Sequence, residues 1–156
     1  MLPIATTVLA ALLSIEPLHL DGYAALTPAF TLMATYHWTI YRPNLLPAPL
    51  LFLIGTMQDL LSGGLPGETA VTLLLARAIV LPQRHYFVDR LFPFIWAGFT
   101  LLTGGAMLFL WALHSMLAAE LLDLRGPVLR AVLTIAVFPI ASFLLGCSQR
   151  ALIGAD

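Results

Sequence analysis

The sequence predicts an all-α membrane protein, a polytopic bundle of about six transmembrane helices. Of its 156 residues, 60% are hydrophobic and only 10% are charged, whereas soluble domains usually carry about 25% charged residues. A water-soluble monomer cannot hide so much apolar surface, and spans of roughly 20 residues each leave no room for a soluble domain. We therefore expect a single integral membrane domain over residues 1–156.

Six apolar segments follow one another along the chain, each bounded by turn-forming residues. We expect spans at residues 2–18, 23–41, 45–62, 66–82, 91–118 and 127–149. The first and fourth are short for a bilayer of about 30 Å, and the fifth is long, at about 42 Å for a straight helix. A variant in which the first segment lies in the membrane interface stays open. The start of the chain lacks the basic region and cleavage pattern of a signal peptide, so we expect a retained first helix.

The arginines predict the orientation in the membrane, because basic residues near span ends are retained in the cytoplasm. With six spans, the side shared by both termini holds more of them than the opposite side. The first group is Arg42, Arg84, Arg90 and Arg150, and the second is Arg125 and Arg130. This favours both termini in the cytoplasm. Aromatic residues at segment ends are expected to anchor at the lipid headgroups, namely Tyr23, Trp38, Tyr41, Tyr86 and Trp111.

The stretch from Gly55 to Glu68 predicts a tight helical hairpin between the third and fourth spans, on the outer side. Gly63 or its neighbour Gly64 can adopt the left-handed conformation that ends a helix, and Pro66 fits the first turn of the next helix. Asp59 lies about one turn before that end, where both the helix dipole and burial in a membrane disfavour a carboxylate. Two interpretations stay open. Asp59 makes a fixed polar contact with a neighbouring helix, a loop amide or a partner chain, or it is solvated at the interface.

Other unusual residues within the spans have simpler interpretations. Arg77 is expected to extend toward the cytoplasmic headgroups instead of pairing with the hairpin carboxylate. Glu68, in the first turn of the fourth helix, is expected to be a solvated cap residue. Gly63 and Gly67 match the spacing of a membrane dimerisation motif, but they straddle a turn, so we set that motif aside. Pro139 predicts a kink in the sixth span.

Residues suited to catalysis or metal binding are few. The histidines lie in different segments without the spacing of metal ligands, at His19, His37, His85 and His114. The single cysteine, Cys147, permits no internal disulfide. His114 and Ser115 are adjacent, which directs them to different helix faces, so no nucleophile with its base is visible. No basic patch suits nucleic acid, and nucleotide-binding glycine patterns are absent. We expect no enzyme, no cofactor and no metal.

Two groups of residues carry a family resemblance. Pro28 and Trp38 lie in the second span and Arg42 and Pro43 follow it directly, and the hairpin contains Gly55, Asp59, Gly63, Pro66 and Gly67. Together with a proline in the last helix, Pro139, they resemble the MreD family of bacterial rod-shape proteins. The specific part of the resemblance covers about residues 28–70, and hydropathy extends it over most of the chain. Family members often have a basic residue before the first helix, and this chain has none.

The resemblance implies a non-enzymatic scaffold of the elongasome in the bacterial inner membrane, which organises peptidoglycan synthesis and controls cell shape. The implied partners are the bitopic protein MreC, the peptidoglycan synthase RodA with its class B penicillin-binding transpeptidase, MreB filaments indirectly, and membrane lipids. No nucleic acid is implied. Helix packing would provide the mechanism. The candidate partner-binding or structural residues are Gly55, Asp59, Gly63, Pro66, Gly67, Arg42 and Pro43.

Two other functions remain as alternatives. The family is similar in fold to the S components of energy-coupling-factor transporters, so a substrate-binding S component of a vitamin transporter is the main alternative. Fold similarity alone does not carry a ligand with it. An intramembrane enzyme or lipid transferase is the weakest alternative, because no acid and base can be named for it.

Overall fold

The computed structural model describes residues 2–15, 29–63 and 65–153. Within these residues the chain forms six α-helices, one turn of 3₁₀-helix and no β-strand. The elements are α1 (Leu2–Ile15), α2 (Phe30–Tyr41), η1 (Pro43–Leu45), α3 (Ala48–Ser62), α4 (Glu68–Val88), α5 (Phe92–Ala118) and α6 (Arg125–Ile153). The predicted all-α fold is confirmed.

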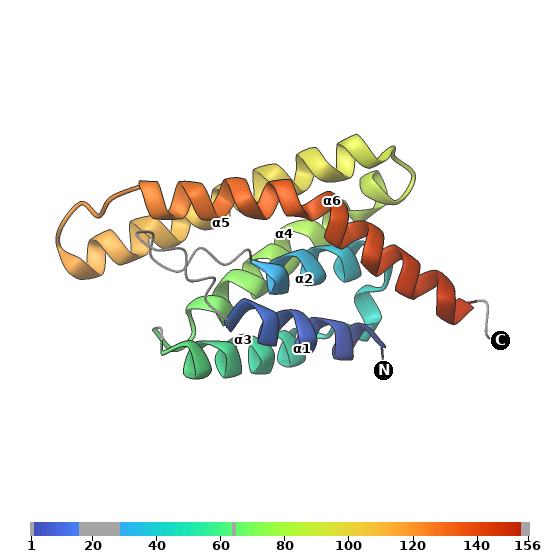
Figure 1. The fold of residues 1–156 in the computed structure, drawn as a ribbon, viewed down its shortest axis with the longest axis horizontal. Coiled ribbons are helices and arrows are strands. Elements are labelled where there is room, and N and C mark those ends of the chain that lie inside the picture. Colours follow the sequence, from blue (N-terminus) through green and yellow to red (C-terminus); the bar gives the residue numbers. More distant parts are fainter. Residues whose placement is uncertain (1, 16–28, 64, 154–156) are drawn as a thin grey trace.

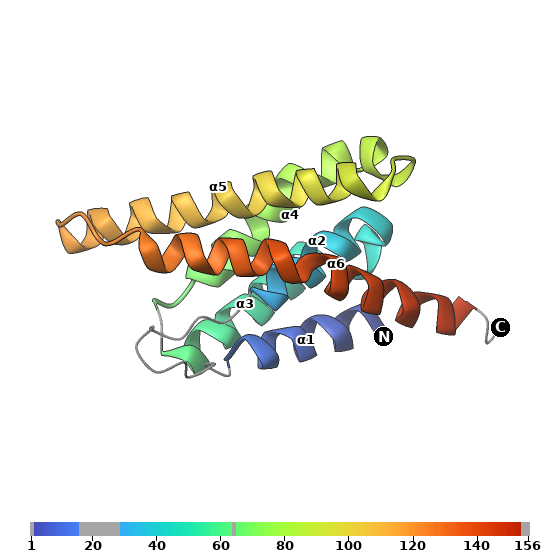
Figure 2. The same cartoon turned by 45° about the horizontal axis from the view of Figure 1, so that its top comes forward.

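Successive helices run in opposite directions, so the start of α1 and the end of α6 lie at the same end of the bundle (Figure 1). We call this the terminal end. The α3–α4 and α5–α6 connections lie at the opposite end, which we call the hairpin end. α2 and α4 lie between α1 and α3 on one side and α5 and α6 on the other, and Figure 2 shows the same arrangement from a second direction.

Neighbouring helices enclose α2 along its length. Every residue from 31 to 40 is buried, because α1, α4 and α6 pack around it. The ring of Tyr36 meets Phe99 and Phe138 edge to face, at centroid distances of 5.2 and 5.8 Å. The Tyr36 hydroxyl donates a hydrogen bond to the Ile95 carbonyl at 2.9 Å. Because aromatic pairs of this geometry add to the free energy of burial, this cluster ties α2 to α5 and α6.

Trp38 is not the headgroup anchor expected from its place near a segment end. It is only 2% exposed, and its indole N–H donates a hydrogen bond to Thr6 Oγ1 of α1 at 2.9 Å. An indole seeks the membrane interface because its ring is apolar and its N–H needs a partner. Here α1 supplies that partner inside the protein. Tyr41 and Tyr86 are exposed, and Tyr23 lies outside the described residues.

The fourth helix is longer than the predicted segment 66–82. It continues through Pro82 to Val88, so residues 84–88, expected in a loop, form its last turns. Phe87 in these turns packs edge to face against Tyr36 and lies close to Gly98 of α5. This packing offsets the hydrogen bond that Pro82 removes from the helix.

The sixth helix changes direction near its middle, and its last turns diverge from the bundle (Figure 1). Pro139 lies within this helix. Proline lacks an amide hydrogen, and its ring clashes with the carbonyl one turn earlier, which bends a helix. The predicted kink is therefore present. By contrast, α5 continues without interruption through Gly104 and Gly105.

Two of the described helices are long and apolar enough to cross a membrane, at Phe92–Ala118 and Arg125–Arg150. Ile4–Ser14 and Ala48–Ser62 are shorter apolar helices. Large apolar side chains also lie on the outside of the bundle, as expected for helices surrounded by lipid. The number of membrane spans stays a prediction.

Candidate functional site

The third helix ends where the sequence predicts, at a left-handed glycine. Gly63 has a φ of 67°, and its amide donates to the carbonyl of Asp59. A residue with a Cβ is strained in this conformation, so glycine is the usual residue at such a helix end. Gly64, the alternative position for this cap, lies outside the described residues.

A tight turn then leads into α4. The amide of Glu68 donates to the carbonyl of Leu65 at 3.2 Å, which closes a four-residue turn. Its third residue, Gly67, has φ 97° and ψ −9°, the conformation of a type II turn that favours proline before it. Pro66 occupies that position. α4 begins at Glu68, so Pro66 does not lie in the first turn of the helix as expected. The type II turn formed by residues 65–68 places the proline two residues before the helix starts.

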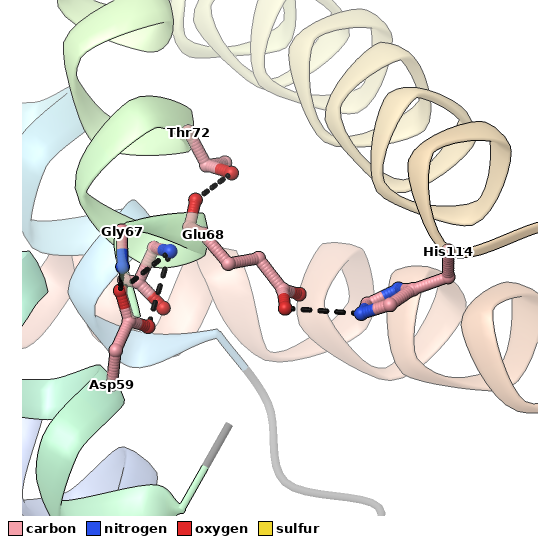
Figure 3. Close-up of polar contacts among 6 residues, drawn as sticks. Asp59, Gly67, Glu68, Thr72 and His114 are labelled. Atoms are coloured by element: carbon pink, nitrogen blue, oxygen red, sulfur yellow. Dashed lines mark hydrogen bonds and ion pairs between the residues drawn. The ribbon is translucent and has the colours of Figure 1, made fainter. Parts of the chain in front are cut away.

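The carboxylate of Asp59 caps the start of α4 from the last turn of α3. Asp59 is 4% exposed, and its side chain accepts hydrogen bonds from the amides of Gly67 at 2.9 Å and Thr69 at 3.1 Å (Figure 3). Gly67 is the N-cap residue and has no side chain to accept these amides. The positive end of the α4 dipole offsets the poor position of this carboxylate in α3. Of the two open interpretations, the structure shows the contact with loop amides.

One turn before Asp59, Gly55 allows α3 and α4 to meet backbone to backbone. A Cβ at Gly55 would lie 2.5 Å from Cα of Ala70 and 2.6 Å from its amide nitrogen. Side chains four residues apart share a helix face, so the Gly55 contact and the Asp59 cap act on the same pair of helices. Among the described helices, no other pair packs as extensively as α3 and α4.

A chain of buried polar side chains connects the hairpin to α1 and α2. The hydroxyl of Thr31 donates to Oε1 of Gln58 at 2.7 Å, and Thr31 Oγ1 lies 3.3 Å from Oγ of Ser14. Ser14 also donates to the carbonyl of Ala10 at 2.8 Å. Buried polar groups that satisfy one another favour a single arrangement of the helices. Sequence patterns did not single out these residues, since isolated Thr and Ser are common in apolar helices.

The carboxylate of Glu68 connects α4 to α5. Its Oε2 lies 3.1 Å from Nε2 of His114 (Figure 3), and its side chain is 19% exposed. The expectation that Glu68 is a solvated cap is therefore wrong, because α5 runs past the start of α4 and brings His114 opposite it. Glu68 and His114 line a cavity of about 480 Å³, and Arg130 of α6 belongs to the same lining. Within the described part of the chain, Nε of Arg130 has no hydrogen-bond partner.

The family of the chain follows from a match over nearly its whole length. The family model of the rod shape-determining protein MreD matches residues 1–147. The chain belongs to the MreD family. No curated protein and no solved structure matches it. The predicted family is thus confirmed, and with it the coarse function: MreD proteins are structural membrane proteins that determine rod shape, and they are not a known family of enzymes.

The residues that resemble MreD motifs do not form a single site. Gly55, Asp59 and the turn glycines lie at the hairpin end, whereas Arg42 and Pro43 lie at the terminal end. Arg42 is the exposed C-cap of α2, and the buried Pro43 begins η1. Arg77 fixes the loop that follows, since its Nε donates to the carbonyl of Leu46 at 3.0 Å. Pro28 lies outside the described residues.

The polar groups of the hairpin make contacts within this MreD family member. Across residues 2–15, 29–63 and 65–153, no group of three or more His, Cys, Asp or Glu side chains lies close enough to hold a metal ion. In the hairpin, the carboxylate of Asp59 and the amide oxygen of Gln58 accept hydrogen bonds from within the protein. These groups hold helices together, and a role in shape determination through helix packing fits them.

Proposed function

We propose that this MreD family member is a non-enzymatic scaffold of the elongasome in the bacterial inner membrane. It binds MreC and helps couple MreB filaments to the peptidoglycan synthase RodA and its class B transpeptidase, which links it to cell-wall synthesis. The family match over residues 1–147 carries the proposal. The whole chain, residues 1–156, is a single membrane domain with six spans.

Both termini face the cytoplasm in this proposal. The helices of the bundle alternate in direction, so the start of α1 and the end of α6 lie on one side (Figure 1). That side carries Arg42, Arg84, Arg90 and Arg150 and the opposite side Arg125 and Arg130, which supports the orientation. Reporter fusions at each terminus test it: a fluorescent protein that folds only in the cytoplasm should fluoresce at both, and a dark fusion at either end contradicts the orientation.

The outer face of α3 is the surface that we assign to MreC. Gly55 and Asp59 are buried against α4, so they act on a partner indirectly, by fixing the hairpin. On the opposite side of α3, the side chains of Leu53, Met57 and Leu60 are 61%, 62% and 69% exposed. Their spacing of four and three residues places them on one face. A single transmembrane helix of a bitopic partner can pack along such a face.

Replacement of the chromosomal gene tests this surface. A variant with Leu53→Ala, Met57→Ala and Leu60→Ala should lose roughly tenfold in co-purified MreC, because each truncation removes packing area, and its cells should round up. A matched variant of α5, with Leu101→Ala, Leu108→Ala and Met116→Ala, removes equally exposed side chains and should keep both properties. If the α3 variant reaches normal membrane levels and retains MreC and rod shape, the assigned surface is wrong.

Depletion of the protein from its native cells tests the wider proposal. Loss of rod shape under the microscope supports the scaffold function. Cells that stay rod-shaped after complete depletion contradict it.

The apolar cavity between α4 and α5 does not support the alternative of a vitamin transporter. The cavity between α4 and α5 has a volume of about 440 Å³ and is lined mainly by apolar side chains. Two hydroxyls in its lining are already used, since Tyr36 donates to Ile95 and Thr72 donates to the carbonyl of Glu68 at 2.8 Å. A small-molecule site needs several polar groups directed at the ligand.

A further inference from the structure

A second cavity lies at the terminal end, away from the hairpin. It has a volume of about 500 Å³, and its lining comes from the end of α2, the start of α5 and the last turns of α6. Pro139 is part of this lining. Because α6 bends there and its last turns diverge from the bundle (Figure 1), the kink creates the space.

The lining contains a buried imidazole with an unused nitrogen. His37 is 4% exposed, and its Nε2 has no hydrogen-bond partner among the described residues. Its ring lies between two aromatic neighbours, with centroids 5.5 Å from Trp38 and 4.7 Å from Tyr41. A buried polar atom without a partner costs about 1–3 kcal/mol. Gln149 of α6 approaches the imidazole from the same lining, and a ligand in the cavity would complete the hydrogen bonds of Nε2.

The charge around the cavity selects an anion. Arg150 of α6 lines it, and no Asp or Glu of the described residues does so. Ser142 and Tyr41 add hydroxyl groups to the same lining. A guanidinium, a hydroxyl and an imidazole N–H all donate hydrogen bonds to phosphate oxygens.

The remaining lining selects a lipid over a free anion. Phe92, Phe143 and Pro139 give the cavity an apolar side, which suits the first carbons of acyl chains. Phe143 is largely exposed on the outside of α6, where acyl chains lie in a bilayer. The terminal end also carries Arg42 and Arg84, and basic residues near the membrane surface attract anionic lipids.

We propose that this cavity binds the phosphate-bearing headgroup of an anionic phospholipid, with Arg150 and Nε2 of His37 as donors to the phosphate. The site lies at the opposite end of the bundle from the α3–α4 hairpin. This site goes beyond the scaffold function, because it would hold one bound lipid at a defined position. The lipid fills the space that the Pro139 bend opens and holds the last turns of α6 against α2 and α5.

Native mass spectrometry of the purified full chain tests the site. The delipidated protein receives either phosphatidylglycerol or phosphatidylcholine, and we expect it to retain the anionic lipid preferentially. Arg150→Gln and His37→Phe should each lower the retained phosphatidylglycerol about tenfold, the effect of losing one charge-assisted hydrogen bond. Arg150 is exposed, so its replacement leaves the core intact even if the His37 variant fails to fold.

Arg90→Gln is the matched control, because Arg90 lies at the same end, stacks over Phe94 at 5.7 Å and does not line the cavity. It should retain phosphatidylglycerol as the unchanged protein does. Equal loss in the Arg90 and Arg150 variants would show general surface attraction and overturn the proposal. Undiminished retention in Arg150→Gln also overturns it. Displacement of the lipid by inorganic phosphate alone would assign the cavity to a free anion instead.

Discussion

The α3–α4 and α4–α5 hairpins share one helix, but the first is closed by backbone contact and the second is held apart. On one face of α4, Ala70 lies so close to Gly55 that no side chain fits between the two helices. On the other face, α4 and α5 meet near Phe87 and Gly98 and again at Glu68 and His114, with a cavity of about 440 Å³ between these contacts.

This difference shows that neighbouring helix pairs in one bundle can have different mechanical roles. The α3–α4 pair has a capped turn, a backbone crossing and a buried carboxylate, all of which fix one geometry. The α4–α5 pair packs less extensively and encloses a cavity, so its middle can adapt. We therefore expect substitutions along the first pair to cost more free energy of unfolding than equivalent substitutions along the second.

The largest effect is expected for Gly55→Leu. A leucine there must separate two backbones, and overpacking of this kind costs about 3 kcal/mol or more. The measurement is the unfolding midpoint in mixed micelles of detergent and sodium dodecyl sulfate. Gly105→Leu on α5 is the control, because a Cβ at Gly105 would meet nothing within 4 Å. Equal losses in the two variants would remove the distinction between the hairpins.

A smaller loss is expected for Asp59→Ala. The amides of Gly67 and Thr69 lose their acceptor in a buried place, which costs about 2 kcal/mol. Asp59→Asn keeps one acceptor oxygen and should lose about half as much. Asp89 is the exposed C-cap of α4, the helix whose start Asp59 caps. Asp89→Ala should leave the unfolding midpoint almost unchanged. A loss in the Asp89 variant as large as that in Asp59→Ala would contradict the capping role.

The pair of Glu68 and His114 should contribute still less to the free energy of unfolding. Both side chains are partly exposed, and exposed ion pairs contribute about 0.2–1 kcal/mol. A double-mutant cycle with Glu68→Gln and His114→Gln measures the coupling directly. A coupling energy larger than the loss of stability in Asp59→Ala would mean that α4 and α5 are held as firmly as α3 and α4.

A small change of opposite sign is expected for Gly105→Ala. Alanine stabilises a helix interior by about 0.5–1 kcal/mol relative to glycine, and space for its methyl group is available. The same substitution at Gly55 should destabilise the protein, because the methyl group meets the backbone of Ala70. If both alanine substitutions changed the free energy of unfolding in the same direction, the close crossing of α3 and α4 would be contradicted.

Local signals in the sequence predicted much of the hairpin. A glycine that ends a helix and a misplaced carboxylate are features of a few consecutive residues, and Gly63 and Asp59 behave as predicted, whereas Pro66 lies in the turn before α4 and not in its first turn. The kink at Pro139 follows from the chemistry of the proline ring in the same way. Such features need no knowledge of the rest of the fold.

Features that depend on distant helices were not predicted. Trp38 is buried because α1 offers Thr6 as a partner, and Glu68 is paired because α5 brings His114 opposite it. α4 extends past Pro82 because Phe87 packs onto the aromatic core. In each case a contact between residues far apart in the sequence overrides a local preference, and one sequence does not reveal which helices meet.

The enclosure of α2 has a consequence for how the chain enters a membrane. Its buried residues include Thr31, Thr35, His37 and Thr39, so it is a poor substrate for insertion by itself. We therefore expect it to insert together with its neighbours. The amide of Ala29, just before α2, bonds to Thr134 of α6 at 3.1 Å. The last helix therefore completes the burial of the second.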